Sequence, residues 1–179
     1  MSKKIELKSP EEAKSYIAKL SESAHATAQT LTTKMKELGP LEFLAEIKFC
    51  RIGCDPLDTD RELNIIEQLN QTFTYLASFM AVEYLYQVHP EISSYQLNLG
   101  TRKGYDIESD NKQIICEVFA AVDPTNNDKL RKDASRLTGQ PSKHKYVFFM
   151  CPGYAQGIQT SDASYPDVKV YSLGLPVTF

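Results

Sequence analysis

The sequence predicts an α/β chain of the α+β type, in which a helical N-terminal half precedes a mixed central β-sheet with a crossover helix. Two observations lead to this prediction. As far as His89, apolar residues recur at spacings of three and four, the period of helices packed on one side. Beyond that point the apolar runs are short, rich in β-branched and aromatic residues, and bounded by Gly, Pro, Asn and Asp, as strands are.

The first helix is expected to begin at a compact start signal. Ser9 is the predicted N-cap, Pro10 takes the first helical position and Glu12 completes a capping box. Gly39-Pro40 ends the helix. The helix carries one long apolar stripe, formed by Ala13, Tyr16, Ile17, Leu20, Ala24, Ala28, Leu31, Met35 and Leu38. Such a stripe must pack either on the body of the domain or on a second copy of the chain.

Two more helices are predicted in the first half. The second runs from about Leu41 to Ile52. The third is expected to start at "DTDRE", where Thr59 and Glu62 suggest another capping box, and to end at His89-Pro90. We therefore expect residues 1–56 to form an N-terminal helical packing or dimerisation region, with a homodimer through these helices as one alternative.

The second half is expected to form the α/β core, residues 57–179. Five strands are predicted, in "SYQLNL", "GYDIES", "KQIICEVFAAV", "KYVFFMC" and "VKVYSL". Between the third and the fourth, Leu130, Ala134 and Leu137 form the apolar stripe of one short helix. This order predicts a mixed sheet with a crossover helix over one face and an edge strand at the end.

Composition and charge narrow the class of protein. The 179 residues have a net charge of −3, which argues against a surface coated with basic residues but allows a local basic cleft. No apolar run is long enough to span a bilayer, and the N-terminus lacks the apolar region of a signal peptide, so we expect a cytoplasmic protein without a membrane partner. The four cysteines are then expected to be reduced thiols.

A pair of carboxylates is the strongest candidate for a site. Alternation along "KQIICEVFAAV" puts Ile115, Glu117 and Phe119 on one face of a strand whose two faces are both apolar, so Glu117 needs a partner. A regular hairpin through "SDNK" would bring Asp106 beside Glu117. Two carboxylates that close repel each other unless a cation or a shared proton intervenes, and Mg²⁺ suits such a pair. The alternative is a salt-bridged structural pair.

This arrangement resembles the PD-(D/E)xK nuclease superfamily over roughly residues 63–151. The resemblance lies in a helix with a Glu near its end, a strand with an Asp, a turn, a strand with Glu-x-Lys, a helix and another strand. It implies a restriction endonuclease-like fold and makes Glu83 in "MAVEYLY" similar to the helix Glu. Asp106 and Glu117 resemble the metal-binding pair, and Val118 would offer its backbone carbonyl to the metal.

The sequence departs from the family motif at one position. Phe119 stands where the family has its catalytic Lys, which is thought to orient or deprotonate the attacking water. Some members supply this Lys from the following helix, where the chain has Lys129 and Lys132. A crossover helix runs back along the sheet, so we expect Lys132 to lie closer to the level of Glu117. Alternatively, Lys129 pairs with Asp133 on a solvated helix face.

The resemblance thus implies a deoxyribonuclease similar to type II restriction endonucleases, which uses Mg²⁺ (or Mn²⁺) and acts on double-stranded DNA. Arg102 and Lys103 in "TRKGY" and Lys143 and Lys145 in "KHK" could contact the phosphate backbone or simply be solvated loop residues. The alternative function is a catalytically inactive nuclease-fold module that binds nucleic acid or protein. A nucleotide-binding glycine motif and a nucleophile elbow are both absent from the sequence.

Overall fold

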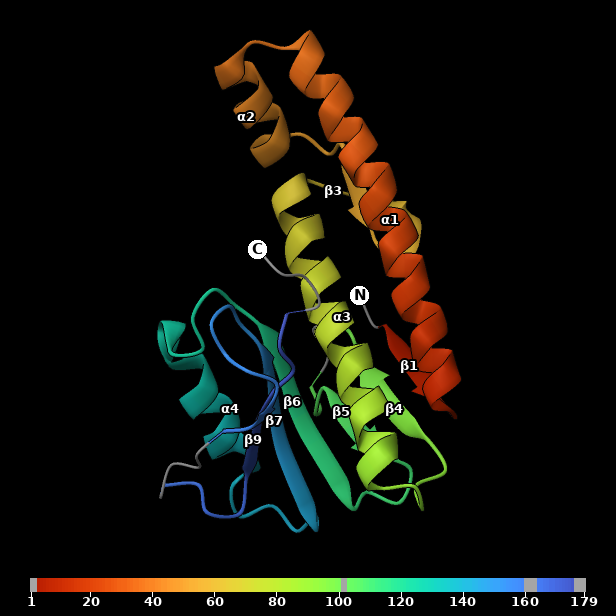
Figure 1. The fold of residues 1–179 in the computed structure, drawn as a ribbon, viewed down its shortest axis with the longest axis vertical. Coiled ribbons are helices and arrows are strands. Elements are labelled where there is room, and N and C mark those ends of the chain that lie inside the picture. Colours follow the sequence, from red (N-terminus) through yellow and green to blue (C-terminus); the bar gives the residue numbers. More distant parts are fainter. Residues whose placement is uncertain (1–2, 101–102, 160–163, 176–179) are drawn as a thin grey trace. The chain divides into compact units, whose positions relative to one another are not determined.

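A computed structural model describes residues 3–100, 103–159 and 164–175 (Figure 1). The chain divides into two compact units. One consists of residues 1–14 and 77–179, and the other of residues 15–76. We call them the sheet unit and the helical unit. The boundary expected after residue 56 falls inside the helical unit, in the turn of a small hairpin.

The first two predicted helices are present. Helix α1 spans Pro10–Glu37 and helix α2 spans Pro40–Phe49. The start of α1 has the predicted cap, because Ser9 Oγ accepts a hydrogen bond of 3.2 Å from Glu12 N. Glu12 Oε2 in turn accepts one of 2.7 Å from Lys8 N. Within the long stripe of α1, Ala13 and Leu20 are buried, whereas Met35 near the end is 60% exposed.

The predicted start of the third helix is wrong. Asp58–Leu63 forms strand β3, which pairs antiparallel with β2 (Gly53–Asp55) in a separate two-stranded sheet. Helix α3 spans Ile65–Val88 and begins instead at Asn64, whose Oδ1 accepts a 2.8 Å hydrogen bond from Glu67 N. The Thr and Glu spacing of a capping box also fits a polar hairpin strand, and pairing with β2 decides between the two.

The sheet unit contains a seven-stranded mixed sheet, as the sequence predicts in outline. Its strands lie in the order β1 (Lys4–Leu7), β4 (Tyr95–Asn98), β5 (Ile107–Ser109), β6 (Ile114–Ala120), β7 (His144–Met150), β9 (Lys169–Ser172) and β8 (Gly157–Ile158). The pairs β6–β7 and β7–β9 are parallel, and the other pairs are antiparallel. The short strands β1 and β8 were not predicted, and β8 rather than β9 forms that edge.

Helix α4 (Lys129–Leu137) is the predicted crossover between β6 and β7 (Figure 1). It follows a 3₁₀ turn, Asn126–Asp128, in which Asn127 and Asp128 have φ values of 55° and 56°. Asn and Asp are the non-glycine residues that tolerate this left-handed region best. The turn is therefore tight, and α4 starts only nine residues after the end of β6.

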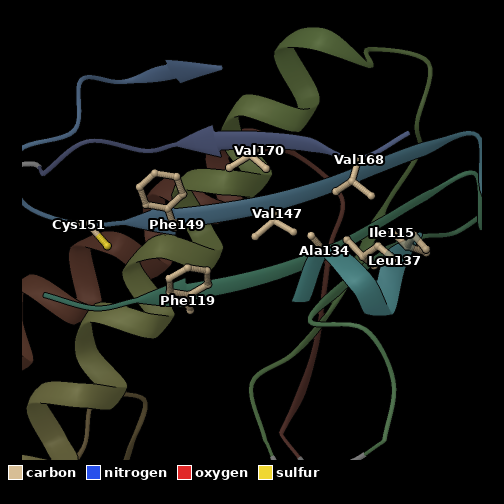
Figure 2. Close-up of a cluster of buried hydrophobic side chains, with 9 residues drawn as sticks. All are labelled: Ile115, Phe119, Ala134, Leu137, Val147, Phe149, Cys151, Val168 and Val170. Atoms are coloured by element: carbon tan, nitrogen blue, oxygen red, sulfur yellow. The ribbon is translucent and has the colours of Figure 1, made fainter. Parts of the chain in front are cut away.

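The two faces of the sheet are covered by different helices. An apolar cluster between the sheet and α4 contains Ile115 and Phe119 of β6, Ala134 and Leu137 of α4, and further residues of β7 and β9 (Figure 2). On the other face, Tyr84 of α3 contacts the rings of Tyr146, Phe148 and Tyr171. Glu117 lies between Ile115 and Phe119 in the alternation of β6 and therefore faces α4.

Within the described part of the chain, no helix combines the length and hydrophobicity that crossing a membrane requires. All four cysteines are free thiols, with Cys50 exposed and Cys116 and Cys151 buried.

Candidate active site under helix α4

Strand register places Asp106 next to Glu117. Strands β5 and β6 pair with Ile107 opposite Cys116, so Asp106, one residue before β5, lies opposite Glu117. Backbone and side chain both fix Asp106 there. Its N–H donates a 3.0 Å hydrogen bond to Cys116 O, and its Oδ2 accepts one of 2.8 Å from Val118 N. The adjacency expected from the sequence is therefore present in the structure.

Glu117 is buried and only partly satisfied. Its side chain is almost inaccessible, and Oε2 accepts a 3.0 Å hydrogen bond from Arg136 Nη1. Oε1 is buried and receives no hydrogen bond from the described residues. Burial, and next the charge of Asp106, raise the pKa of Glu117 to about 8, against the lowering effect of Arg136.

The pKa of Asp106 is raised as well. Burial raises its pKa, while the hydrogen bond from Val118 N and the charge of Lys129 oppose this rise. With a pKa of about 8, Glu117 is largely protonated at neutral pH.

A third acid, Asp133 of α4, was missed by the sequence analysis as a site residue. It is buried, and its Oδ1 accepts a 2.8 Å hydrogen bond from Lys129 Nζ, while Oδ2 receives none from the described residues. Burial raises the pKa of Asp133, and its charge raises the pKa of Asp106 and of Glu117. The pair of Lys129 and Asp133 anticipated from their spacing is present, but Asp133 lies against the sheet rather than in solvent.

Arg136 was likewise missed. Besides Glu117, its guanidinium donates a hydrogen bond to Gly104 O and stands 5.6 Å from the ring centre of Tyr105. It thus connects α4 to the loop that leads into β5. A sequence signal for both omissions exists, because residues 129, 133 and 136 have the spacing of one helix face and flank the apolar stripe of α4.

Of the two candidate lysines, Lys129 rather than Lys132 lies near the carboxylates. Lys129 Nζ stands 5.7 Å from the ring centre of Phe119, and its charge lowers the pKa of Asp106. Lys132 Nζ instead donates to Asn127 O, on the exposed side of α4. The expected position of Lys132, closer than Lys129 to the level of Glu117, was wrong. The turn at Asn126–Asp128 is tight, so α4 begins close to the end of β6. Its first turn, with Lys129, already lies over the end of β6.

Glu83 is not brought to this pair. It lies on α3, which packs on the opposite face of the sheet through its neighbour Tyr84. Burial raises the pKa of Glu83, and the charges that act on it are those of Lys14, which lowers it, and Glu11.

The four basic residues that were expected to contact phosphate lie in different surroundings. Arg102 lies outside the described residues. Lys103 and Lys143 are exposed in loops. Lys145 is buried and its Nζ pairs with Asp167 Oδ2 at 2.7 Å, a bond that lowers the pKa of Asp167. Lys145 thus has an internal partner, and Lys103 and Lys143 are the cations of this set that face solvent.

The fit of a metal ion rests on the donor set. Among the described residues no three His, Cys, Asp or Glu side chains are grouped closely enough to hold a metal ion. Mg²⁺, however, is commonly bound by one or two carboxylates together with waters and phosphate oxygens. Asp106 and Glu117 supply two carboxylates, and the buried Glu117 Oε1 lacks a donor. The two carboxylates are donors of the type that a partly hydrated Mg²⁺ ion takes.

Comparisons with known proteins do not add a family to this description. No family model, no curated protein and no solved structure matches the chain.

Proposed function

We propose that this chain is a metal-dependent nuclease of the restriction endonuclease-like fold that cleaves phosphodiester bonds in double-stranded DNA. The observation that carries the proposal is the half-satisfied, buried Glu117 beside Asp106, with Lys129 above Phe119 on the same face of the sheet. The element order supports it as well. Helix α3, the antiparallel strands β4, β5 and β6, helix α4 and the parallel strand β7 follow the layout that the resemblance implies.

In this proposal each residue has a defined part. Asp106 and Glu117 hold Mg²⁺ or Mn²⁺, which polarises the scissile phosphate and lowers the pKa of bound water when it is present. Val118 N fixes one Asp106 oxygen, leaving the other for the cation. Glu117 must release its proton on binding, so metal affinity increases as the pH approaches about 8. Lys129 takes the place of the motif lysine, and Asp133 holds its ammonium group over Phe119.

A second candidate function has one observation in its favour. Arg136 already supplies a positive charge to Glu117 Oε2 and bridges to Gly104 O. A guanidinium in this position can replace a metal ion in neutralising the acidic pair. The chain would then be an inactive nuclease-fold module that binds nucleic acid or protein, and Lys129 and Asp133 would be a structural ion pair.

A cleavage assay on a plasmid in Mg²⁺ and in Mn²⁺ separates the two functions. We expect cleavage that is lost in the double variant Asp106→Ala, Glu117→Ala. Lys129→Ala should reduce the rate by about 100-fold or more, the usual scale for a residue that positions or deprotonates water. Lys132→Ala, on the same helix, is the matched control and should stay within about threefold of the parent.

Thermal unfolding with Mn²⁺ tests metal binding independently of turnover. Binding to the native state raises the melting temperature, and a chelator reverses the rise. The double carboxylate variant should lose this response, whereas Lys132→Ala should keep it. An unchanged melting temperature in millimolar Mn²⁺, together with no cleavage, would favour the inactive module. Cleavage that persists in the double variant would refute the site itself.

A further inference from the structure

The helical unit exposes an unusual amount of apolar surface. Six large apolar side chains on two of its helices are between 39% and 81% exposed: Leu41, Leu44 and Phe49 of α2 and Ile66, Leu69 and Phe73 of α3. None of the described residues of α2 is buried. A helix of ten residues is not stable in water without packing of its apolar side.

Helix α2 presents apolar side chains outward. The exposed positions Leu41, Leu44, Ala45 and Phe49 follow the i, i+3, i+4, i+8 spacing of a single helix face, interrupted only by Lys48. The opposite side holds Phe43 and Ile47, which are half-buried, and Glu46, which pairs with Lys34 of α1 at 3.2 Å. The helix is therefore apolar on both sides, and the half-buried side leaves the exposed apolar residues without a contact that would cover them.

Helix α3 carries a matching stripe. Ile66, Leu69, Phe73 and Leu76 are separated by three, four and three residues, which is the spacing of the seam between two paired helices. The first three are exposed and Leu76 is half-buried. The start of α3 lies close to β2, because a Cβ at Gly53 would lie 3.1 Å from Ile65 Cδ1 and 2.1 Å from Gln68 Oε1.

We propose that the stripes of α2 and α3 form a homodimer interface with the same surface of a second copy of the chain. The area is sufficient. The six side chains leave on the order of 600 Å² of apolar surface in water, which equals or exceeds the apolar share of the about 800 Å² that each partner buries in a typical stable interface. It is also at the upper end of the largest apolar patch on ordinary monomers, about 300–600 Å².

The charge of this surface distinguishes among occupants. Between Ile65 and Val82 the only charged side chain is Glu67, so two copies of this helix do not repel each other. A helix that binds a membrane surface carries a polar face rich in Lys and Arg, whereas Lys48 is the only such residue of α2. A nucleic acid would also need a basic surface, because its phosphate backbone is negatively charged. A neutral apolar surface with helix-pairing spacing fits a copy of itself, in the isologous manner of most homodimers.

Sedimentation of the full chain tests the proposal. We expect a mass of about 40 kDa at tens of micromolar, twice the 20.2 kDa of one chain. Leu44→Glu in α2 and Leu69→Glu in α3 should each raise the dissociation constant at least about tenfold, because each buries a charge in the interface. The matched controls are Val122→Glu and Ile158→Glu, which alter exposed apolar residues of the sheet unit, 82% and 62% exposed. They should leave the mass unchanged.

An exposed native thiol gives a second readout that does not depend on the substitutions. Cys50 follows Phe49 at the end of α2 and is exposed, whereas Cys116 and Cys151 are buried. A spin label on Cys50, in a chain with Cys54→Ser, should show a label-to-label distance that disappears on dilution. A mass of one chain at tens of micromolar would overturn the proposal. So would dissociation by the control variants as readily as by Leu44→Glu and Leu69→Glu, provided that circular dichroism shows all four variants folded.

Discussion

The two faces of the central sheet bury polar groups in different ways. On the face covered by α3, aromatic rings fill the layer and the buried polar groups are neutral: the hydroxyl of Tyr146 has a partner in His89 Nε2 at 2.8 Å, and that of Tyr95 has none among the described residues. On the face covered by α4, the apolar cluster contains the carboxylates of Glu117 and Asp133, each with one buried oxygen that no described residue hydrogen-bonds.

This difference separates a layer built for stability from one that costs stability. Burial of a carboxylate costs stability, and it is the main cause that raises the pKa values of Glu117, Asp106 and Asp133. Groups with such shifts, close together and beside a lysine, are typical of functional sites. Replacing a buried ring on the α3 face and replacing the buried Glu117 carboxyl on the α4 face should therefore have effects of opposite sign.

The largest effect is expected on the α3 face. Phe148 is fully buried and its ring lies 5.8 Å from that of Tyr84 and 5.3 Å from that of Tyr146. Phe148→Ala removes these contacts and leaves a cavity, so we expect a loss of about 3–5 kcal/mol in the free energy of unfolding. Urea denaturation measures this loss. A loss below about 1 kcal/mol would mean that this layer is not the stabilising one.

A smaller effect of opposite sign is expected at Glu117. Its folded pKa of about 8 lies above its ordinary value of 4.5, so the folded state binds more protons than the unfolded state between these values. Stability should consequently decrease as the pH rises from about 4.5 to about 8. Glu117→Gln keeps the shape but cannot ionise, so it should flatten this dependence and make the chain more stable than the parent at pH 8.

Melting temperatures of the parent and of Glu117→Gln across this pH range provide the measurement. The difference between the two proteins should be negligible near pH 4 and greatest near pH 8 or above. Equal slopes would show that Glu117 does not hold its proton in the folded state. Asp133 would then be the buried carboxyl group left to explain why the α4 face costs stability.

The smallest effect is expected at Arg136. Its side chain is 47% exposed, so its pair with Glu117 should contribute no more than about 1 kcal/mol. The guanidinium favours the ionised form of Glu117, and Arg136→Met should raise the pKa of Glu117 above about 8. The loss of stability should accordingly appear only at pH values above about 8. A loss of the same size at pH 6 would indicate that Arg136 acts mainly through Gly104 and Tyr105.

Local patterns account for the elements that the sequence predicted well. The start of α1 depends on Ser9 and Glu12, which interact within one turn, and the strands β6 and β7 are long apolar runs. The edge strands β1 and β8 are short and half polar, so their sequences carry little signal until a neighbouring strand is present. The same holds for β3, whose residues matched a helix start until β2 paired with them.

The candidate site likewise has one part that local sequence predicts and one part that contacts between distant residues decide. The sequence by itself determined that Asp106 and Glu117 lie side by side, since a short hairpin and the two-residue period of a strand are local properties. Only the tertiary structure decided which α4 residues join them. The rotation of α4 about its axis is set by the packing of Ala134 and Leu137 on β6 and β7, between residues far apart in the chain. That packing turns Lys129, Asp133 and Arg136 toward the carboxylates and leaves Lys132 outside.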